Sequence, residues 1–74
     1  MNYTNLQLEA RLKKLTPREK EVFMLVSRGV PNKVSADRLG VSQRTIEAHR
    51  ANIFKKMQVR NATELMHDLF ASYL

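Results

Sequence analysis

The two histidines, at positions 49 and 67, are the side chains best suited to metal binding or acid–base chemistry, and they stand far apart. A zinc site or a catalytic centre needs several such groups at matched spacings, and no ligand set or nucleophile–base pair accompanies either histidine. The chain also has no cysteine, which excludes thiolate nucleophiles, disulfides and Cys-based zinc sites. We therefore expect no enzyme activity, no metal and no cofactor, and the charged side chains become the better guide to function.

Positive charge dominates the sequence, with 13 Lys and Arg against 7 Asp and Glu, a formal net charge of +6 and a pI of about 10.2. Such an excess either belongs to an ordinary solvated surface or serves a polyanionic partner, usually nucleic acid and less often an anionic membrane. Its distribution favours nucleic acid, because residues 42–60 carry a net +4 and residues 61–74 a net −2. The charged side chains of residues 42–60 are Arg44, Arg50, Lys55, Lys56 and Arg60, with Glu47 as the single acid.

Helix start and stop signals predict where the first elements lie. Leu8, Leu12 and Leu15 fall at i, i+4 and i+7, which predicts a short N-terminal helix over about residues 6–14. The Thr-Pro-Arg-Glu stretch at residues 16–19 then forms a capping box with proline at the first helical position. A left-handed glycine at position 29 is expected to close the helix that this box begins.

Three further helices follow, and no strand signal or repeat interrupts them. Asn32 is predicted to cap a short helix over residues 33–39, which Gly40 ends. Ser42 caps the next helix, which runs to about Met57, and Asn61 with Glu64 caps the last. The inward positions expected in the short helix are Val34, Ala36 and Leu39.

Gly40 joins two helices through a short turn, and helices joined in this way cross at a steep angle. The small side chain of Ala36 lies one turn before the glycine, where the helices must approach, and Ile46 follows as an apolar plug. This spacing indicates a DNA-binding helix-turn-helix, with a plain helical hairpin as the alternative. The predicted fold class is all-α: a compact four-helix bundle containing a helix-turn-helix, with an N-terminal helical extension.

The helix that begins after Ser42 has two contrasting faces at 100° per residue. Its apolar face carries Ile46, Ile53 and Met57, with Phe54 at the edge. The opposite face has two alanines at its centre, so the backbone can sink into the major groove of DNA while longer side chains reach the walls. That outward face consists of Arg44, Glu47, Ala48, Ala51 and Lys55.

Residues 15–65 closely resemble the LuxR-type helix-turn-helix domain. The matching marks are "LTPRE", "G-x-x-NK", "A-x-x-L-x-[VI]-S-x-x-T-[VI]-x-x-H" and "[IL]-x-x-K-[LM]-x-V". The stretch "RTIEAHRANIFKKM" is most similar to the FixJ branch of two-component response regulators. The resemblance implies a four-helix bundle in which the third helix reads DNA, the fourth commonly forms the dimer interface and an upstream domain regulates both.

Carried over position by position, the resemblance implies base reading by Glu47, Ala48 and Ala51. We expect Arg44, on the same outward face, to read bases as well. It implies phosphate contacts from five residues, and we add Lys55 at the edge of the same face. The expected phosphate ligands are Lys33, Ser42, Thr45, His49, Lys55 and Lys56. The chain departs from the family pattern at Ser35, where a small aliphatic residue is usual.

An acidic residue at position 47 is unexpected on a surface that faces DNA, because a carboxylate repels phosphate. It either accepts a hydrogen bond from the N4 amino group of cytosine or forms an ion pair with Arg44 or Arg50. Arg50 lies near the apolar side of its helix and is itself expected to pair with Glu19 or Glu21.

The last helix is apolar and free of Lys and Arg, which suits a subunit interface. Leu65 and Leu69 are expected in the core of the domain, which leaves a small patch for pairing. Because so small an interface is weak, we expect a monomer in dilute solution that pairs on DNA. The predicted dimer patch is Ala62, Met66, Phe70 and Tyr73. The methionines at 24, 57 and 66 are expected mainly as core filler.

The predicted partners are double-stranded DNA, a second copy of the chain, an upstream receiver domain absent from it, and RNA polymerase as a further candidate. A protein-interaction module or a sigma-like promoter-reading region are the alternatives. No apolar run approaches the ~20 residues that span a bilayer, so we expect a cytoplasmic protein. We divide the chain into an extension or interdomain linker helix, residues 1–14, and the DNA-binding domain, residues 15–74. The similarity of "QLEARLKKL" to the linker helix of relatives favours a fragment over a stand-alone regulator.

Overall fold

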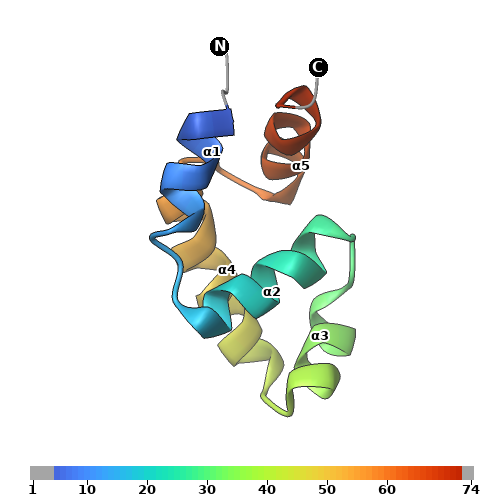
Figure 1. Cartoon of the computed structure of the whole chain (residues 1–74). Helices are drawn as coiled ribbons and strands as arrows, with labels where there is room; N and C mark the ends of the chain where they lie inside the picture. The colour runs from blue at the N-terminus through green and yellow to red at the C-terminus, as the bar shows by residue number, and fades with distance from the viewer. Residues whose placement is uncertain (1–4, 73–74) are drawn as a thin grey trace.

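The computed structural model describes residues 5–72, and every regular element in that range is an α-helix (Figure 1). The helices are α1, Asn5–Leu12; α2, Pro17–Ser27; α3, Asn32–Leu39; α4, Gln43–Met57; and α5, Ala62–Ala71. The predicted all-α bundle with an N-terminal helical extension is therefore confirmed. None of the helices between residues 5 and 72 has the length and apolar character needed to cross a bilayer.

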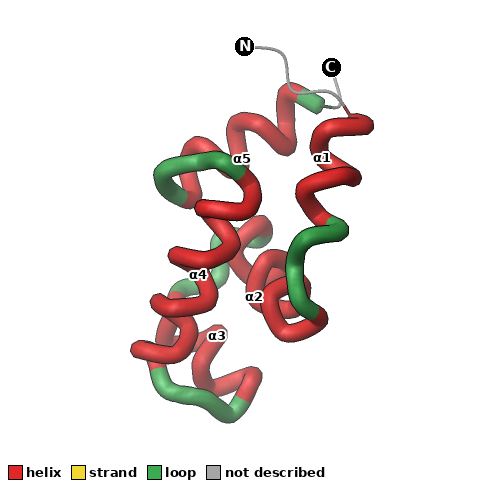
Figure 2. The backbone as a smooth tube through the Cα atoms, turned by 90° about the vertical axis from the view of Figure 1, so that its left-hand side faces the viewer, coloured by secondary structure: helices red, strands yellow, loops and turns green. Residues whose placement is uncertain are grey.

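The central element is α4, which packs against each of the other four helices. Figure 2 shows it between α5 and α3, with α2 alongside. The apolar face predicted for this helix is confirmed, because Ile46, Ile53 and Met57 are completely buried. They form the core together with Leu15, Val22, Phe23, Val26, Ala36, Val59 and Leu65.

Side-chain caps begin three of the helices where the sequence predicts them. Thr16 Oγ1 accepts from the Glu19 N–H at 3.1 Å, and the Glu19 carboxylate accepts from the Thr16 N–H at 2.9 Å, so the capping box is complete. Ser42 caps α4 by accepting from the Thr45 N–H at 3.1 Å. Each such cap contributes on the order of 1 kcal/mol, because it satisfies a backbone N–H that the helix leaves without a partner.

The cap of α5 differs from the prediction in one detail. Asn61 Oδ1 accepts from the Glu64 N–H at 2.9 Å, as expected. The reciprocal bond goes one residue further back, because Glu64 accepts from the Arg60 N–H at 2.9 Å and from the Arg60 guanidinium at 2.8 Å. These hydrogen bonds hold the pKa of Glu64 below its usual range.

Left-handed residues end α2, α3 and α4. Gly29 at φ 74° and Gly40 at φ 68° take this conformation without a side-chain clash. Gln58 ends α4 at φ 59°, and it is the one residue other than glycine with positive φ between residues 5 and 72. The Val41 N–H donates to the Ala36 carbonyl at 3.0 Å, which fixes the sharp corner between α3 and α4.

The start and inward face of α3 correct two expectations. Pro31 occupies the cap position and no side chain caps the helix, so the predicted Asn32 cap is wrong. Val34 is 38% exposed, whereas Ser35 is 1% exposed. Small side chains at positions 35 and 36 allow α3 to approach α4 closely at the corner, and the larger valine turns outward.

Two of the three methionines expected as core filler are exposed. Met57 is completely buried, but Met24 is 47% and Met66 is 43% exposed. The buried residues of α2 on either side of Met24 occupy the face toward the core, which leaves Met24 on the outer side. Val59, which lies in the loop after α4, is buried instead.

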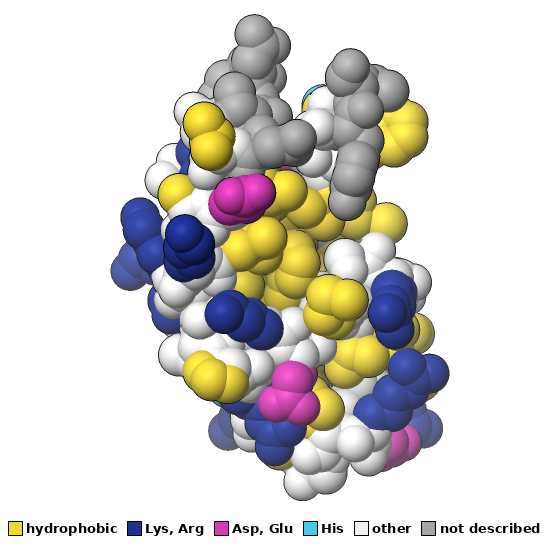
Figure 3. Space-filling model, in the orientation of Figure 1, with side chains coloured by type: hydrophobic (Ala, Val, Ile, Leu, Met, Phe, Trp, Pro, Cys, Tyr) yellow, Lys and Arg dark blue, Asp and Glu magenta, His cyan; other side chains and the backbone are white. Residues whose placement is uncertain are grey.

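The N-terminal helix α1 docks on the bundle. Leu8 and Leu12 pack against the core and Leu15 is buried within it, so the predicted stripe is confirmed. Figure 3 shows hydrophobic side chains gathered between α1 and α5, above α2. An isolated helix of eight residues is not stable in water, and α1 therefore depends on these contacts.

Candidate nucleic-acid interface

The outward face of α4 has the composition that the sequence predicts. Arg44, Glu47, Ala48, Ala51 and Lys55 are all exposed, and the three large apolar residues of the same helix are completely buried on its other side. The two alanines leave the centre of the face low, while Arg44 and Lys55 stand at its two ends. The structure thus presents one rigid helix with a shallow centre and charged ends to solvent.

Two hydroxyl groups lie together where α4 begins. Ser42 Oγ and Thr45 Oγ1 are 3.0 Å apart, and Ser42 Oγ also accepts from the Thr45 N–H. Because one hydroxyl proton suffices to join the two oxygens, the other O–H remains available to donate to an external acceptor. An anionic oxygen such as that of a phosphate is a suitable acceptor at this place.

Lys33 and His49 are the other predicted phosphate ligands that the structure leaves accessible. Lys33 is exposed on the first turn of α3, a helix without a side-chain cap. An uncapped helix N-terminus favours an anion, because its N–H groups and dipole both point outward. His49 is half-buried on α4, and no ion pair joins it to another residue of the described range.

Lys56 lies in a different environment from the other predicted ligands. Its Nζ donates to Glu19 Oε1 at 2.6 Å, and the side chain of Glu19 is only 6% exposed. Burial disfavours the charged form of Glu19, but hydrogen bonds from Lys56 and the Thr16 N–H, with the Lys56 charge, outweigh it and hold the pKa of Glu19 below its usual range. The phosphate contact of Lys56 remains a prediction, while its ion pair links α4 to the start of α2.

Arg50 does not pair with Glu19 or Glu21, and that expectation is wrong. Lys56 occupies Glu19, and Arg18 pairs with Glu21 at 3.5 Å. The Arg50 guanidinium instead lies over the Phe54 ring, 5.2 Å from its centre, a cation–π contact.

Glu47 makes no ion pair with another residue of the range 5–72, so the pairing with Arg44 or Arg50 is not found. Its carboxylate is exposed on the outward face of α4. The hydrogen bond from cytosine stays a prediction.

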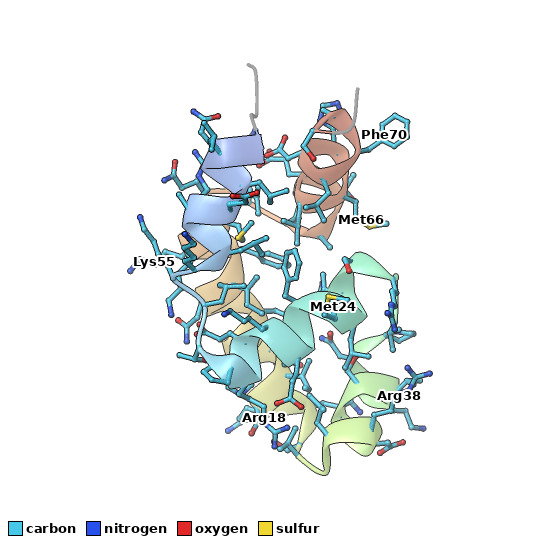
Figure 4. All side chains as sticks on the ribbon, in the orientation of Figure 1. Arg18, Met24, Arg38, Lys55, Met66 and Phe70 are labelled. Carbon is cyan, nitrogen blue, oxygen red and sulfur yellow. The ribbon has the colours of Figure 1, made fainter. Side chains whose placement is uncertain are left out.

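The predicted dimer patch is exposed on α5, as far as the structure describes it. Met66 is 43% and Phe70 is 67% exposed, and both point away from the bundle in Figure 4. Ala62 is half-buried, and Tyr73 lies outside the described residues. A hollow of about 350 Å³ adjoins the patch, lined by Val26, Arg50, Ala62 and Met66 among others.

No three potential metal-ligating side chains converge anywhere in residues 5–72. Two other interactions have no signal in the sequence: the Lys56–Glu19 ion pair and the hydrogen bonds from Arg11 to the end of α4. Arg11 Nη1 donates to the Met57 carbonyl at 3.3 Å and Nη2 donates to Gln58 Oε1 at 3.0 Å. Both interactions join residues far apart in sequence, which local patterns do not reveal.

Residues 13–69 match the family described as "Bacterial regulatory proteins, luxR family". Over 59 residues the chain is 42% identical to the transcriptional regulatory protein FixJ of Rhizobium meliloti (strain 1021), covering 80% of this chain and 29% of that protein. Over 56 residues it is 36% identical to the nitrate/nitrite response regulator protein NarL of Escherichia coli (strain K12), covering 76% of this chain and 26% of that protein.

Two solved structures share the helical arrangement. Response regulator StyR superimposes with a TM-score of 0.79 at 41% identity, covering 86% of this chain and 32% of that one. Full-length FixJ from B. japonicum gives a TM-score of 0.79 at 37% identity, covering 88% and 32%. The chain thus spans less than a third of the length of these relatives. It belongs to the LuxR family of bacterial regulatory proteins.

Proposed function

We propose that this chain binds double-stranded DNA sequence-specifically, as the output domain of a bacterial transcription regulator of the response-regulator kind. The observation that supports this most is the exposed face of α4, which is low at Ala48 and Ala51 and charged at its ends. The family membership of the chain and the concentration of positive charge in residues 42–60 agree with it.

In this proposal α4 enters the major groove with Ala48 and Ala51 against the base edges. Small side chains there bring the helix close enough for Arg44 to reach a guanine and for Glu47 to accept from a cytosine amino group. Because Glu47 has no cation partner within residues 5–72, its carboxylate can be satisfied by a base.

Contacts to the DNA backbone hold the helix in register. Ser42 and Thr45 together have a hydroxyl proton to donate at the start of α4, and Lys33 extends from the uncapped start of α3. Lys55 and His49 provide further phosphate contacts along α4. Lys56 is also proposed as a phosphate ligand, although its ion pair with Glu19 gives it a competing structural role.

We propose further that α5 pairs two copies on adjoining half-sites. Met66 and Phe70 lie one helical turn apart and are both exposed. Residues four apart lie on the same face of a helix, so both side chains can pack against a second copy of α5. The patch is small, so pairing is weak without DNA. An upstream receiver domain would control this pairing by covering or releasing α5, and RNA polymerase is a further partner of the assembled regulator.

A helical protein-interaction module is the competing function, and the exposure of Met66 and Phe70 is the observation that favours it. In that case α5 would dock an unrelated protein, and the basic surface would bind any duplex equally. The two functions therefore differ in whether DNA sequence matters.

Selection of bound sequences from random duplex DNA, followed by competition gel shifts, tests the proposal. We expect a shared sequence arranged as a pseudo-palindrome, which unlabelled selected duplex competes away and random duplex does not. Equal competition by both duplexes would contradict sequence-specific binding. A single unrepeated site would favour a sigma-like promoter-reading region.

A further inference from the structure

A second concentration of positive charge lies outside α4, at the end of α1 and the start of α2. Residues 11–20 contain five Lys and Arg and one acid, Glu19, a net +4 that equals the net charge of residues 42–60. Glu19 is already occupied by Lys56 of α4. Arg18 pairs with Glu21, just beyond this range, and no ion pair joins Lys13, Lys14 or Lys20 to another residue between 5 and 72.

Lys13 and Lys14 are the exposed centre of this charge. They follow α1 directly, both are exposed, and neither forms an ion pair with another residue between 5 and 72. Two adjacent ammonium groups repel each other when no anion lies between them. An external anion would stabilise both.

The docking of α1 places these lysines beside the end of the outward face of α4. Arg11, two residues before Lys13, donates to the Met57 carbonyl at 3.3 Å and to the Gln58 side chain at 3.0 Å. A cation that donates to the last carbonyls of a helix is favoured there by the helix dipole. Through these bonds the C-terminal turn of α4 holds the segment that carries Lys13 and Lys14.

Figures 1, 3 and 4 agree with this placement. Lys and Arg side chains gather along the left edge of Figure 3, where α1 and the α1–α2 connection lie in Figure 1. Lys55, the last residue of the outward face of α4, points to the same edge in Figure 4. Arg38 lies at the opposite edge of that view.

We propose that Lys13 and Lys14 form a second phosphate-binding surface, which contacts the DNA backbone beside the stretch read by α4 and which Arg11 holds in place. The inference rests on the proposed function, because it extends the same DNA complex along the duplex. Arg11 is in this view a positioning residue, since it acts through the end of α4.

Binding to duplexes of two lengths tests the inference. A short duplex contains only the selected half-site, and a longer one extends it by several base pairs on both sides. Each phosphate contact steepens the fall of log affinity with log salt by about one unit. We expect the wild-type chain to bind the longer duplex more tightly, with a slope steeper by up to about two.

The variant K13Q/K14Q should lose this difference between duplexes while binding the short duplex like the wild type. The matched control R28Q/R38Q removes two exposed positive charges elsewhere on the surface and should keep the difference. Arg11→Lys retains the charge but not the forked guanidinium. This variant should reduce the difference in binding between the two duplexes, measured at a temperature at which thermal melting shows that it is folded.

A K13Q/K14Q variant that still gains from the longer duplex would overturn the inference. Equal loss on both duplexes would also overturn it, since the lysines would then act only through total charge. If the wild-type chain binds the short duplex specifically but gains nothing from the longer one, this inference fails and the proposed function stands. If the wild-type chain shows no preference for the selected duplex, the proposed function fails as well.

Discussion

Lys55 and Lys56 are neighbours in sequence but lie in different environments, because Lys55 is exposed and Lys56 forms an ion pair with the buried Glu19. We therefore expect the removal of Lys55 to weaken DNA binding and the removal of Lys56 to lower stability. Lys56→Ala leaves the buried Glu19 carboxylate without its cation. Breaking a fully buried pair costs about 3–5 kcal/mol, and solvent screening lowers this because Lys56 is 33% exposed. We expect a loss of roughly 1–3 kcal/mol in the free energy of unfolding, measured with urea.

Lys55→Ala is the matched control for this substitution. Because Lys55 is exposed, its removal should change stability by less than about 0.5 kcal/mol and flatten the salt dependence of DNA binding by about one unit. If Lys56→Ala instead leaves stability unchanged and flattens the salt dependence, Lys56 is a phosphate ligand and its ion pair is incidental.

Glu19 makes the stability of the domain depend on pH in a defined direction. Its pKa is held below the usual range in the folded chain, so its ionised form favours folding. That contribution is complete above the unfolded pKa of about 4.3 and is lost as the pH falls through the folded pKa. The stability gap between wild type and Glu19→Gln, from urea midpoints at successive pH values, should narrow on acidification. A gap that stays constant down to about pH 2 would show that Glu19 does not act through its charge.

At the scale of elements, Gly40 decides the geometry of the corner between α3 and α4. Its φ of +68° is strained for residues with a Cβ, although a Cβ there would meet nothing within 4 Å. Gly40→Ala should therefore lower the free energy of unfolding by about 1–2 kcal/mol through backbone strain alone, and Gly40→Asn by less. Urea unfolding measures both. An alanine variant as stable as the wild type would mean that the corner adopts another conformation.

The elements could be predicted wherever a local signal fixes them. Thr16, Ser42 and Asn61 carry their own hydrogen-bonding groups to the helix starts, and Gly40 supplies the left-handed turn. On the inward face of α3, Ala36 is buried and Leu39 packs against the core as predicted, but Val34 is not buried. Only the approach of α4 makes Ser35 a better core residue than Val34. The short N-terminal stripe predicted a helix but not its place on the bundle.

Of the candidate site, the exposed face of α4 could be predicted from the sequence, but the contacts between helices could not. The exposed face of α4 follows from its helical period, since the apolar residues of one side imply the outward residues of the other. The ion-pair partner of Glu19 could not be predicted from the sequence, because α4 carries both Arg50 and Lys56 as candidate cations. Only the packing of α4 against α2 brings Lys56 to Glu19 and leaves Arg50 over the Phe54 ring. The Arg11 contact at the end of α4 likewise depends on how α1 docks.

At the scale of the whole molecule, α5 should control pairing without controlling folding. Met66 is 43% exposed, so Met66→Glu should leave the fold intact and abolish cooperative binding to a palindromic duplex. Met24→Glu is the control, because Met24 is 47% exposed on another surface. Sedimentation with and without the duplex, together with thermal melting, checks both variants. Unfolding of Met66→Glu alone would place Met66 in the core and the dimer interface elsewhere.

The central proposal is that the outward face of α4 reads DNA, and Ala51 lies at the middle of that face. Ala51→Glu should leave stability within about 0.5 kcal/mol of the wild type, because the position is exposed. It should nevertheless hold the helix out of the groove and add a charge that phosphate repels. The measurement is the ratio of affinities for selected and random duplex, in the wild type and in this variant. We predict a strong preference in the wild type that falls to nearly equal binding in Ala51→Glu; an unchanged preference in the variant would contradict reading by α4.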